Sequence, residues 1–359
     1  MLPKPAAKLP LIDPGTTIRA MLKLMDATGT GIALAVDDQR HLIAALTDGD
    51  VRRAILDGID LEWSVSQLLA MRDARGITRP PVTASITNTD EELRALMIST
   101  GVRQIPILDL EDRVVGLATE SDYVKSAELG LDGFIMAGGF GKRLMPLTKD
   151  VPKPMLPVNG KPLLEHIVEK LRNSGIKHVN ISTHYLAETI TGHFRDGKDF
   201  GVEIEYVSED KPMGTAGALS KFVSRNDPLL VVNGDVLTSV NYRAMLDFHR
   251  EHSADMTIAV CPHELQIPFG VLTIEGIDAK GIVEKPKVRN FVNAGIYLLQ
   301  PAISGMVPSD RKFDMTDLID ACISAGKKVI CFPIREYWLD VGQIEQYERA
   351  SVDSSAGAV

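Results

Sequence analysis

The sequence has few cysteines, no long apolar run and no excess of basic residues. Its three cysteines, Cys261, Cys322 and Cys331, are odd in number and lack metal-type spacing, so we expect reduced core residues. No 18 apolar residues run together, and the N-terminus lacks the apolar core of a signal peptide. We therefore expect a cytoplasmic protein without a membrane anchor. The net charge of -9 argues against a nucleic-acid partner, which would require a basic face.

The length and composition favour a two-domain globular protein. A chain of 359 residues exceeds one ordinary hydrophobic core, and 45% hydrophobic with 24% charged residues is typical of a folded protein. We expect one domain at 1–128, a second at 129–350, and a disordered tail at 351–359, where the residues are small and polar.

The first 128 residues contain an internal repeat with a period of about 70 residues. Each copy has two short β-like runs joined by an acidic turn, followed by Thr-x-x-Asp at the start of a helix: 31–36, 42–46 and 47–55 in the first copy, and 102–108, 114–118 and 119–124 in the second. The pattern predicts a duplicated module.

This half resembles a tandem pair of cystathionine-β-synthase-type (CBS) regulatory modules. The resemblance implies that Asp50 and Asp122 hold a nucleotide ribose and that Thr47 and Thr119 lie near its phosphate. Two other interpretations stay open. Each Thr-x-x-Asp is also a common helix cap, and the pair could be structural or dimerising without binding a ligand.

The second half begins with a glycine-rich stretch, 133–144, followed by two prolines around Lys153. An apolar run that opens into glycines and then cations is typical of a buried strand followed by a loop that holds a polyphosphate. The spacing excludes a P-loop, since Met136 stands where that motif needs glycine, and a dinucleotide fingerprint, since Leu144 replaces its third glycine.

Beyond this loop, strand-like and helix-like segments alternate. The pattern predicts an α/β fold with a mostly parallel sheet and helices on both faces, in which ligands bind at the carboxyl ends of the strands. Two aspartates come after β-like runs, Asp235 after 231–234 and Asp340 after 329–332. Since Mg²⁺ on substrate phosphates takes one or two protein carboxylates, Asp235 and Asp340 are our candidate Mg²⁺ ligands.

Seven motifs together make residues 133–350 resemble the sugar-1-phosphate nucleotidyltransferases, the family of mannose-1-phosphate guanylyltransferases and glucose-1-phosphate thymidylyltransferases. In chain order they lie at 138–144, 153–157, 214–217, 233–235, 284–286, 293–297 and 338–342. The resemblance implies a Rossmann-like nucleotidyltransferase domain, in which a sugar 1-phosphate attacks a nucleoside triphosphate and releases pyrophosphate.

The resemblance also implies site residues. Arg143 would hold the leaving pyrophosphate, Lys153 the reacting phosphates, and Asp235 with Asp340 the Mg²⁺. The substrate-binding set would be completed by Gly138, Gly139, Gly141, Gly214, Thr215, Glu284, Lys285 and Asn293.

Within this family, 209–219 resembles the guanylyltransferase branch, so GTP is the favoured donor, and the sugar would be glucosamine or mannose. The fused CBS pair suggests control by a nucleotide. We also expect a homo-oligomer. The alternatives are a thymidylyl- or uridylyltransferase, or a non-catalytic nucleotide sensor with a degenerate transferase domain.

Overall fold

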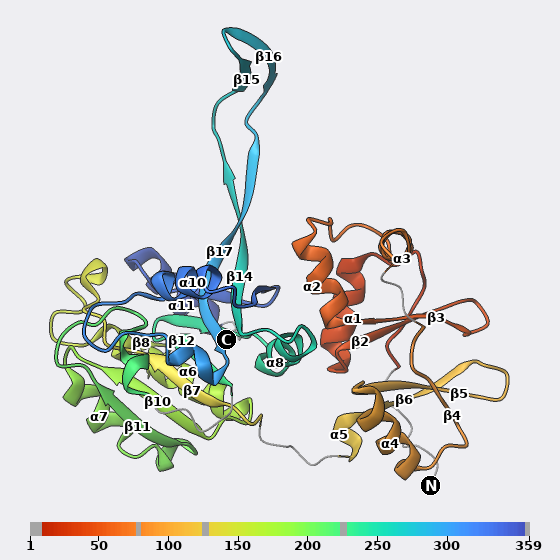
Figure 1. Cartoon of the computed structure of the whole chain (residues 1–359), viewed down its shortest axis with the longest axis horizontal. Helices are drawn as coiled ribbons and strands as arrows, with labels where there is room; N and C mark the ends of the chain where they lie inside the picture. The colour runs from red at the N-terminus through yellow and green to blue at the C-terminus, as the bar shows by residue number, and fades with distance from the viewer. Residues whose placement is uncertain (1–8, 77–79, 124–128, 223–227, 356–359) are drawn as a thin grey trace. The chain divides into compact units, whose positions relative to one another are not determined.

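The chain folds into two compact units, Met1–Ala127 and Glu128–Val359. The computed structural model shown in Figure 1 describes residues 9–76, 80–123, 129–222 and 228–355. The expected domain boundary, between residues 128 and 129, lies one residue from this division. No described helix is both long enough and apolar enough to cross a membrane.

The first unit contains the expected repeat. Its first copy comprises β1 (Leu11–Ile12), α1 (Ile18–Thr28), β2 (Ile32–Val36), β3 (Leu42–Thr47), α2 (Asp48–Leu56) and α3 (Val65–Ala74). Its second copy comprises β4 (Ala84–Ser85), α4 (Asp90–Thr100), β5 (Gln104–Leu108), β6 (Val114–Thr119) and α5 (Glu120–Tyr123).

The two copies form equivalent three-stranded sheets. The strand orders are β1-β2-β3 and β4-β5-β6, each with one parallel and one antiparallel pair. Ile32 pairs with Thr47 in one sheet, as Gln104 pairs with Thr119 in the other. The copies also share a small apolar core, in which Leu34 from the first and Val114 from the second are fully buried. The duplicated module is therefore one folded body.

The second unit is a larger α/β structure. Its strands are β7 (Asp132–Met136), β8 (Pro157–Val158), β9 (Lys161–Pro162), β10 (His178–Thr183), β11 (Glu203–Ser208), β12 (Leu229–Asn233), β13 (Val236–Thr238), β14 (Met256–Gln266), β15 (Val271–Glu275), β16 (Asp278–Val283), β17 (Lys287–Leu299), β18 (Val329–Pro333) and β19 (Trp338–Asp340). Its α-helices are α6 (Leu163–Asn173), α7 (Ala187–Phe194), α8 (Tyr242–Glu251), α9 (Pro301–Ser304), α10 (Met315–Ser324) and α11 (Ile344–Ser355), and its 3-10 turns are η1 (Lys142–Leu144), η2 (Lys153–Met155), η3 (Lys198–Phe200) and η4 (Gly217–Lys221).

The central sheet has seven strands in the order β11-β10-β7-β12-β17-β14-β18. All neighbours are parallel except for the two pairs that include β17, so the prediction of a mostly parallel sheet is confirmed. Strands β7 and β12 lie side by side near its centre. Their carboxyl ends therefore open at the same edge, where the glycine-rich loop and Asp235 follow.

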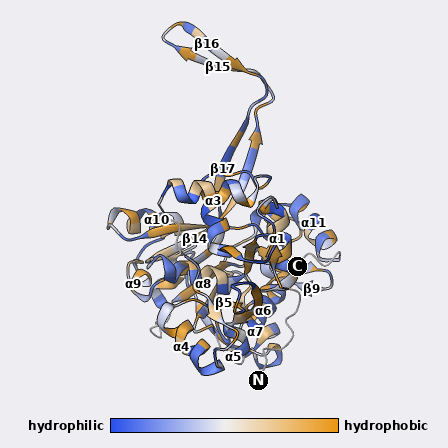
Figure 2. Cartoon of the chain, turned by 90° about the vertical axis from the view of Figure 1, so that its right-hand side faces the viewer, coloured by the Kyte–Doolittle hydropathy of each residue, from blue (hydrophilic) through white to orange (hydrophobic). Residues whose placement is uncertain are grey.

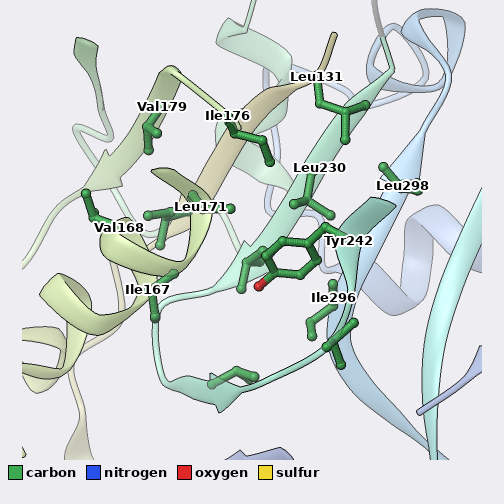
Figure 3. Close-up of a cluster of buried hydrophobic side chains, with 14 of the residues drawn as sticks. Leu131, Ile167, Val168, Leu171, Ile176, Val179, Leu230, Tyr242, Ile296 and Leu298 are labelled. Carbon is green, nitrogen blue, oxygen red and sulfur yellow. The ribbon is translucent and has the colours of Figure 1, made fainter. Parts of the chain in front are cut away.

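Helix α6 shows how the sequence pattern builds the core. Its apolar residues recur at helical spacing and are all buried: Leu163, Leu164, Ile167, Val168 and Leu171. All but Leu163 pack among side chains from the sheet, including Leu230 and Ile296 (Figure 3). Leu163 packs in a neighbouring cluster with Leu237 and Leu339. Shortening one such residue to alanine typically costs about 2–5 kcal/mol of unfolding free energy. The helix therefore fixes the sheet that carries the glycine-rich loop.

A long β arm extends from the central sheet (Figure 1). It comprises residues 261–292, where β14 and β17 continue beyond the sheet, pairing from Cys261↔Val292 to Gln266↔Lys287. The hairpin β15–β16 forms its distal part. Between these two parts, Lys285 has a positive φ of 46°. The arm was not expected from the sequence.

Three local predictions are wrong. Cys331 is exposed rather than in the core, because β18 is an edge strand that pairs only with β14. Helix α11 continues to Ser355, so residues 351–355 are not a disordered tail, and residues 356–359 lie outside the described residues. The composition of residues 126–132 predicts the end of a helix and a short linker, but Leu129 and Leu131 belong to the core of the second unit.

Candidate active site

A cavity of about 270 Å³ lies at the carboxyl edge of the central sheet. Eight residues line it: Gly139, Phe140, Gly141, Lys142, Arg143, Lys153, Asp235 and Gly342. The structure thus brings together five of the twelve site residues that we predicted in this unit. The cavity is rich in cations and exposed glycine backbone, which suits a polyphosphate.

The loop after β7 depends on glycine at position 141. Gly141 has a φ of 63°, and a Cβ there would lie 2.9 Å from the Cβ of Lys153 and 3.0 Å from Thr148. Thr148 also donates a hydrogen bond to the Gly141 carbonyl. A side chain at position 141 would therefore push against the lysine that lines the cavity. Gly139 has nothing within 4 Å of an added Cβ.

Lys153 lines the cavity and forms an ion pair with Asp235. Its residue is only 8% exposed. Pro152 and Pro154 flank it and fix the backbone that begins the turn η2. The ammonium group is thus held where it can contact an incoming phosphate.

Strands β13 and β19 bring the two predicted carboxylates together. These short strands pair antiparallel, with Val236 opposite Asp340. The Val341 N–H donates to the Asp235 carbonyl, which extends the pairing by one step. Residues separated by about a hundred positions thereby meet beside the cavity.

Asp340 carries an unsatisfied oxygen. Its Oδ1 is buried and has no hydrogen-bond partner among the described residues. Burial and the neighbouring Asp235 raise the pKa of Asp340, while Lys153 and Arg143 oppose this shift. A buried acceptor with no donor, next to a second carboxylate, suits a bound cation.

The metal-binding potential of the site comes from these two aspartates alone. No group of three or more His, Cys, Asp or Glu in the described ranges is placed to hold a metal ion. Mg²⁺ bound with substrate phosphates needs only one or two carboxylates, so Asp235 and Asp340 fit this ion better than a site built wholly from protein ligands.

Asn293 lies in the sheet and shapes the same edge. Its Oδ1 accepts a hydrogen bond from the Gly295 N–H at 2.9 Å. Gly295 has a φ of 71°, and a Cβ there would lie 2.5 Å from Asn233 Nδ2. The Trp338 indole donates to the Ala294 carbonyl. These contacts tie the 233–235, 293–297 and 338–342 motifs into one structural unit.

Gly214 and Thr215 lie against the start of α10 and do not line the cavity. The Thr215 N–H donates to Asp314 Oδ1 at 3.0 Å, and Thr215 Oγ1 accepts from the Met315 N–H at 2.7 Å. A Cβ on Gly214 would lie 2.6 Å from the Phe313 carbonyl. The loop is therefore held by one bond to Asp314 and one from Met315, two residues that the sequence reasoning did not single out.

Glu284 and Lys285 lie on the exposed arm, and neither lines the cavity. A Cβ added to Gly270 would lie 3.0 Å from Glu284 Oε2 and 3.0 Å from Ile282 Cδ1. Gly138 also does not line the cavity, although it adjoins Gly139. The roles assigned to these three residues stay predictions.

Glu209 is a buried carboxylate that the sequence reasoning did not assign a role. It is 8% exposed, and its Oε2 accepts from the Met213 N–H at 3.0 Å. Its Oε1 faces Gly138, where an added Cβ would lie 2.9 Å away. Burial raises the pKa of Glu209. The search for a carboxylate after a β-like run, which found Asp235, would also have found Glu209, because Glu209 directly follows β11 at the same sheet edge.

The four candidate regulatory residues form helix caps in the first unit. Asp50 Oδ2 accepts from both the N–H and the hydroxyl of Thr47, at 2.8 and 2.9 Å. Asp122 makes the same two bonds with Thr119, at 2.8 and 2.7 Å. The capping interpretation of Thr-x-x-Asp is therefore confirmed, and ligand binding is a separate proposal.

The two caps differ in their surroundings. The Asp50 side chain is 9% exposed, with Arg53 at 2.8 Å and Arg72 at 3.5 Å from Oδ1. Asp122 is exposed. Only the first cap thus combines a buried carboxylate with converging arginines.

Family profiles match both units. The profile described as nucleotidyl transferase matches residues 132–356, well over half of the chain. The chain belongs to the nucleotidyl transferase family. The CBS domain profile matches twice in the remaining part, at residues 5–57 and 72–128. The CBS pair and the nucleotidyltransferase fold predicted from the motifs are confirmed.

Similar proteins differ in the base that their names give. A mannose-1-phosphate guanylyltransferase of Mycobacterium tuberculosis is 33% identical over 63% of this chain and 65% of its own length. A UTP–glucose-1-phosphate uridylyltransferase of Synechocystis is 32% identical over 61% of this chain and 62% of its own length. This chain thus spans less than two thirds of these nucleotidyltransferases.

A solved structure shares the fold of this chain. HddC from Yersinia pseudotuberculosis complexed with GMP-PN superimposes with a TM-score of 0.50 and 27% identity, over 62% of this chain and 99% of that one. Family membership and fold therefore rest on agreement between sequence and structure, while the base and the sugar are matters for proposal.

Proposed function

We propose that the protein transfers a nucleotidyl group from a nucleoside triphosphate to a sugar 1-phosphate. A phosphate oxygen of the sugar forms a bond to the α-phosphorus, and the bond from that phosphorus to the bridging oxygen breaks, releasing pyrophosphate. The observation that carries the proposal is the cavity in which Arg143 and Lys153 face Asp235 at the edge of the sheet. No general base is required, because a sugar phosphate is mostly dianionic at neutral pH.

The chain's own groups would position and neutralise the phosphates. The Gly139 and Gly141 backbone and Arg143 would hold the departing pyrophosphate, since all three line the cavity. A phosphate oxyanion would compete with Asp235 for the ammonium group of Lys153, which lines the cavity. Asp235 and Asp340 would hold Mg²⁺, which supplies charge neutralisation at the phosphates when bound. Removing such a charge typically lowers kcat by about 10²–10³-fold.

We propose guanine as the base, and Glu209 supports this choice. The Watson–Crick edge of guanine carries two adjacent donors, N1–H and the N2 amino group. A carboxylate only accepts, so it suits this edge and repels the carbonyl oxygens that flank N3–H of uracil or thymine. Glu209 keeps Oε1 directed at Gly138, next to the cavity. For the sugar, glucosamine and mannose 1-phosphate are the candidates, with Glu284, Lys285 and Asn293 as the proposed contacts.

The test is pyrophosphate release with Mg²⁺ for the four common ribonucleoside triphosphates and dTTP against a panel of sugar 1-phosphates. We expect turnover with GTP and loss of at least 100-fold in Asp235→Ala. Asp210→Ala is the matched control, because its side chain is 95% exposed and lies outside the cavity. Turnover only with UTP or dTTP would overturn the guanylyl assignment. Silence across the panel in a folded protein would favour a nucleotide sensor.

We further propose that a nucleotide binds the CBS pair near Asp50 and alters the rate. The supporting observation is the buried Asp50 with Arg53 and Arg72, which together offer a ribose acceptor and phosphate-binding cations. Arg72→Ala should weaken nucleotide binding and with it the effect of the nucleotide on the rate. Arg75→Ala, which breaks an exposed pair with Asp57, should not. Equal nucleotide effects in wild type, Asp50→Ala and Asp122→Ala would end this proposal.

A further inference from the structure

An exposed aromatic side chain lines the cavity of the candidate active site. Exposed apolar side chains are frequent on the β arm, where Figure 2 shows orange segments on the projecting ribbon. Phe140 lies apart from these: it is 39% exposed and belongs to the lining of the cavity. His184 and Tyr185 contact its ring, each with 5.4 Å between ring centroids. Phe140 therefore offers a fixed apolar surface within a cavity whose other lining residues are charged or glycine.

The ammonium group of Lys142 lies over this ring. The distance from Nζ to the Phe140 centroid is 5.6 Å, which is within the range of a cation–π contact. Such a contact is weak when the cation is exposed, as Lys142 is. Among the residues that the structure describes, no carboxylate forms an ion pair with Lys142. This cation of the cavity lining is therefore held loosely and can exchange Phe140 for an anion.

The two lysines of the cavity are held in different ways and on different sides of the loop. Lys153 is buried and paired with Asp235, which follows β12. The ring under Lys142 is held by His184 and Tyr185, which follow β10. Strand β7 lies between β10 and β12 in the sheet. A chain of phosphates across the loop after β7 would therefore meet a fixed cation on one side and a loosely held one on the other.

We propose that Lys142 binds the terminal phosphate of the nucleoside triphosphate and exchanges it with the Phe140 ring. This inference rests on the proposed function, in which Lys153 and Asp235 serve the reacting phosphates. The terminal phosphate carries nearly two negative charges at neutral pH, so it is the strongest anion of the chain. A flexible lysine binds a phosphate as a point charge, without the fixed geometry that an arginine requires. The same contact would retain the pyrophosphate after the reaction.

The first test measures binding of GTP and of GMP to the full chain by calorimetry, with Mg²⁺ and without sugar 1-phosphate. Lys142→Met keeps the length of the side chain and removes its charge. It should weaken GTP binding by about 10–100-fold, as for loss of a hydrogen bond to a charged group, and leave GMP binding unchanged. Lys142→Arg keeps the charge and should recover most of the GTP affinity. If the wild type binds UTP or dTTP instead, that nucleotide and its monophosphate are compared.

Lys149→Met is the matched control for the loss of charge. Lys149 is exposed on the same loop and does not line the cavity, so both affinities should stay at the wild-type values. Unchanged GTP binding in Lys142→Met, or an equal loss for GTP and GMP, would overturn the contact with the terminal phosphate. A Lys142→Arg variant as weak as Lys142→Met would show that charge is not the cause.

The second test separates this inference from the proposed function. Selective loss of GTP binding in Lys142→Met, together with no turnover of any sugar 1-phosphate by the wild type, would refute the transferase and keep the contact. Turnover with unchanged GTP binding in Lys142→Met would do the reverse. In the active enzyme, the inhibition constant of inorganic pyrophosphate should rise at least about tenfold in Lys142→Met and stay unchanged in Lys149→Met. An unchanged constant in Lys142→Met would contradict retention of pyrophosphate by this lysine.

Discussion

Lys153 and Asp235 are 82 residues apart in the sequence and form an ion pair in the lining of the cavity. The pair joins the loop after β7 to the turn after β12, two neighbouring strands of the central sheet. Each partner has a second task in the proposed reaction, one toward phosphate and one toward Mg²⁺. In the proposed reaction, phosphate and Mg²⁺ would therefore each compete with this ion pair.

Lys153→Met should lower kcat by about 10²–10³-fold, because a fixed cation next to the reacting phosphates is lost. The measurement is steady-state pyrophosphate release. Lys161→Met is the control, since Lys161 is exposed and pairs with Glu169 away from the cavity. Retention of wild-type kcat in Lys153→Met would show that this lysine has no role in the reaction.

Gly141→Ala and Gly139→Ala should differ sharply although both change the same loop. The added methyl at 141 would meet Lys153 and Thr148 in a left-handed backbone, whereas at 139 it would meet nothing within 4 Å. We expect a loss of activity of at least tenfold in Gly141→Ala, with a thermal shift to lower Tm, and a smaller change in Gly139→Ala. Equal losses in the two variants would mean that the glycines serve the ligand and not Lys153.

Glu209→Gln should change the preference for the base. Glutamine offers one acceptor and one donor, which suits the N3–H and carbonyl edge of uracil or thymine better than the two donors of guanine. We expect kcat/KM for GTP to fall by about 5–150-fold, as for loss of one bidentate base contact of ~1–3 kcal/mol, while the ratio of UTP to GTP turnover rises. A uniform fall for all nucleotides would assign Glu209 to loop structure through its bond to Met213.

Asp340→Asn should stabilise the protein near neutral pH while reducing its activity. Because burial and Asp235 raise the pKa of Asp340 in the folded state, the folded protein holds this proton at pH values where the unfolded chain has released it. Stability from this group is therefore lost as pH rises from the ordinary value of 3.8 through the raised pKa. The asparagine variant avoids that loss.

The check is a series of thermal unfolding curves from acidic to neutral pH without divalent metal. Each kcal/mol gained should raise Tm by about 2–4 °C at neutral pH, with a smaller difference below the ordinary pKa of the carboxyl. Added Mg²⁺ should stabilise the wild type more than Asp340→Asn. If the Tm of Asp340→Asn fell relative to that of the wild type as the pH rose to neutral, the predicted direction of this stability effect would be wrong.

The sequence predicted those features that depend on local pattern. The apolar stripe from Leu163 to Leu171 follows from its helical spacing, and Asp235 follows from its position just after a buried strand. The arm could not be predicted in this way. Leu272 and Ile274 alternate as residues of a half-buried strand do, and a local pattern does not reveal whether another element covers them.

The candidate site shows the same division. The family resemblance implied that Lys153 and Asp235 would act on the same phosphates, and both line the cavity. It did not reveal the ion pair between them, nor the bonds of Thr215 with Asp314 and Met315, since these depend on where α10 packs. Glu209 was within reach of sequence reasoning and was missed because its motif was interpreted only for base preference.

The pairing of β13 with β19 also sets an order in time. Translation produces the loop after β7, Lys153 and Asp235 long before the ribosome adds Trp338–Asp340. A nascent chain can therefore form most of the phosphate cavity while the second carboxylate is still unsynthesised. Competence for the proposed reaction would begin only when β19 has been synthesised and pairs with β13.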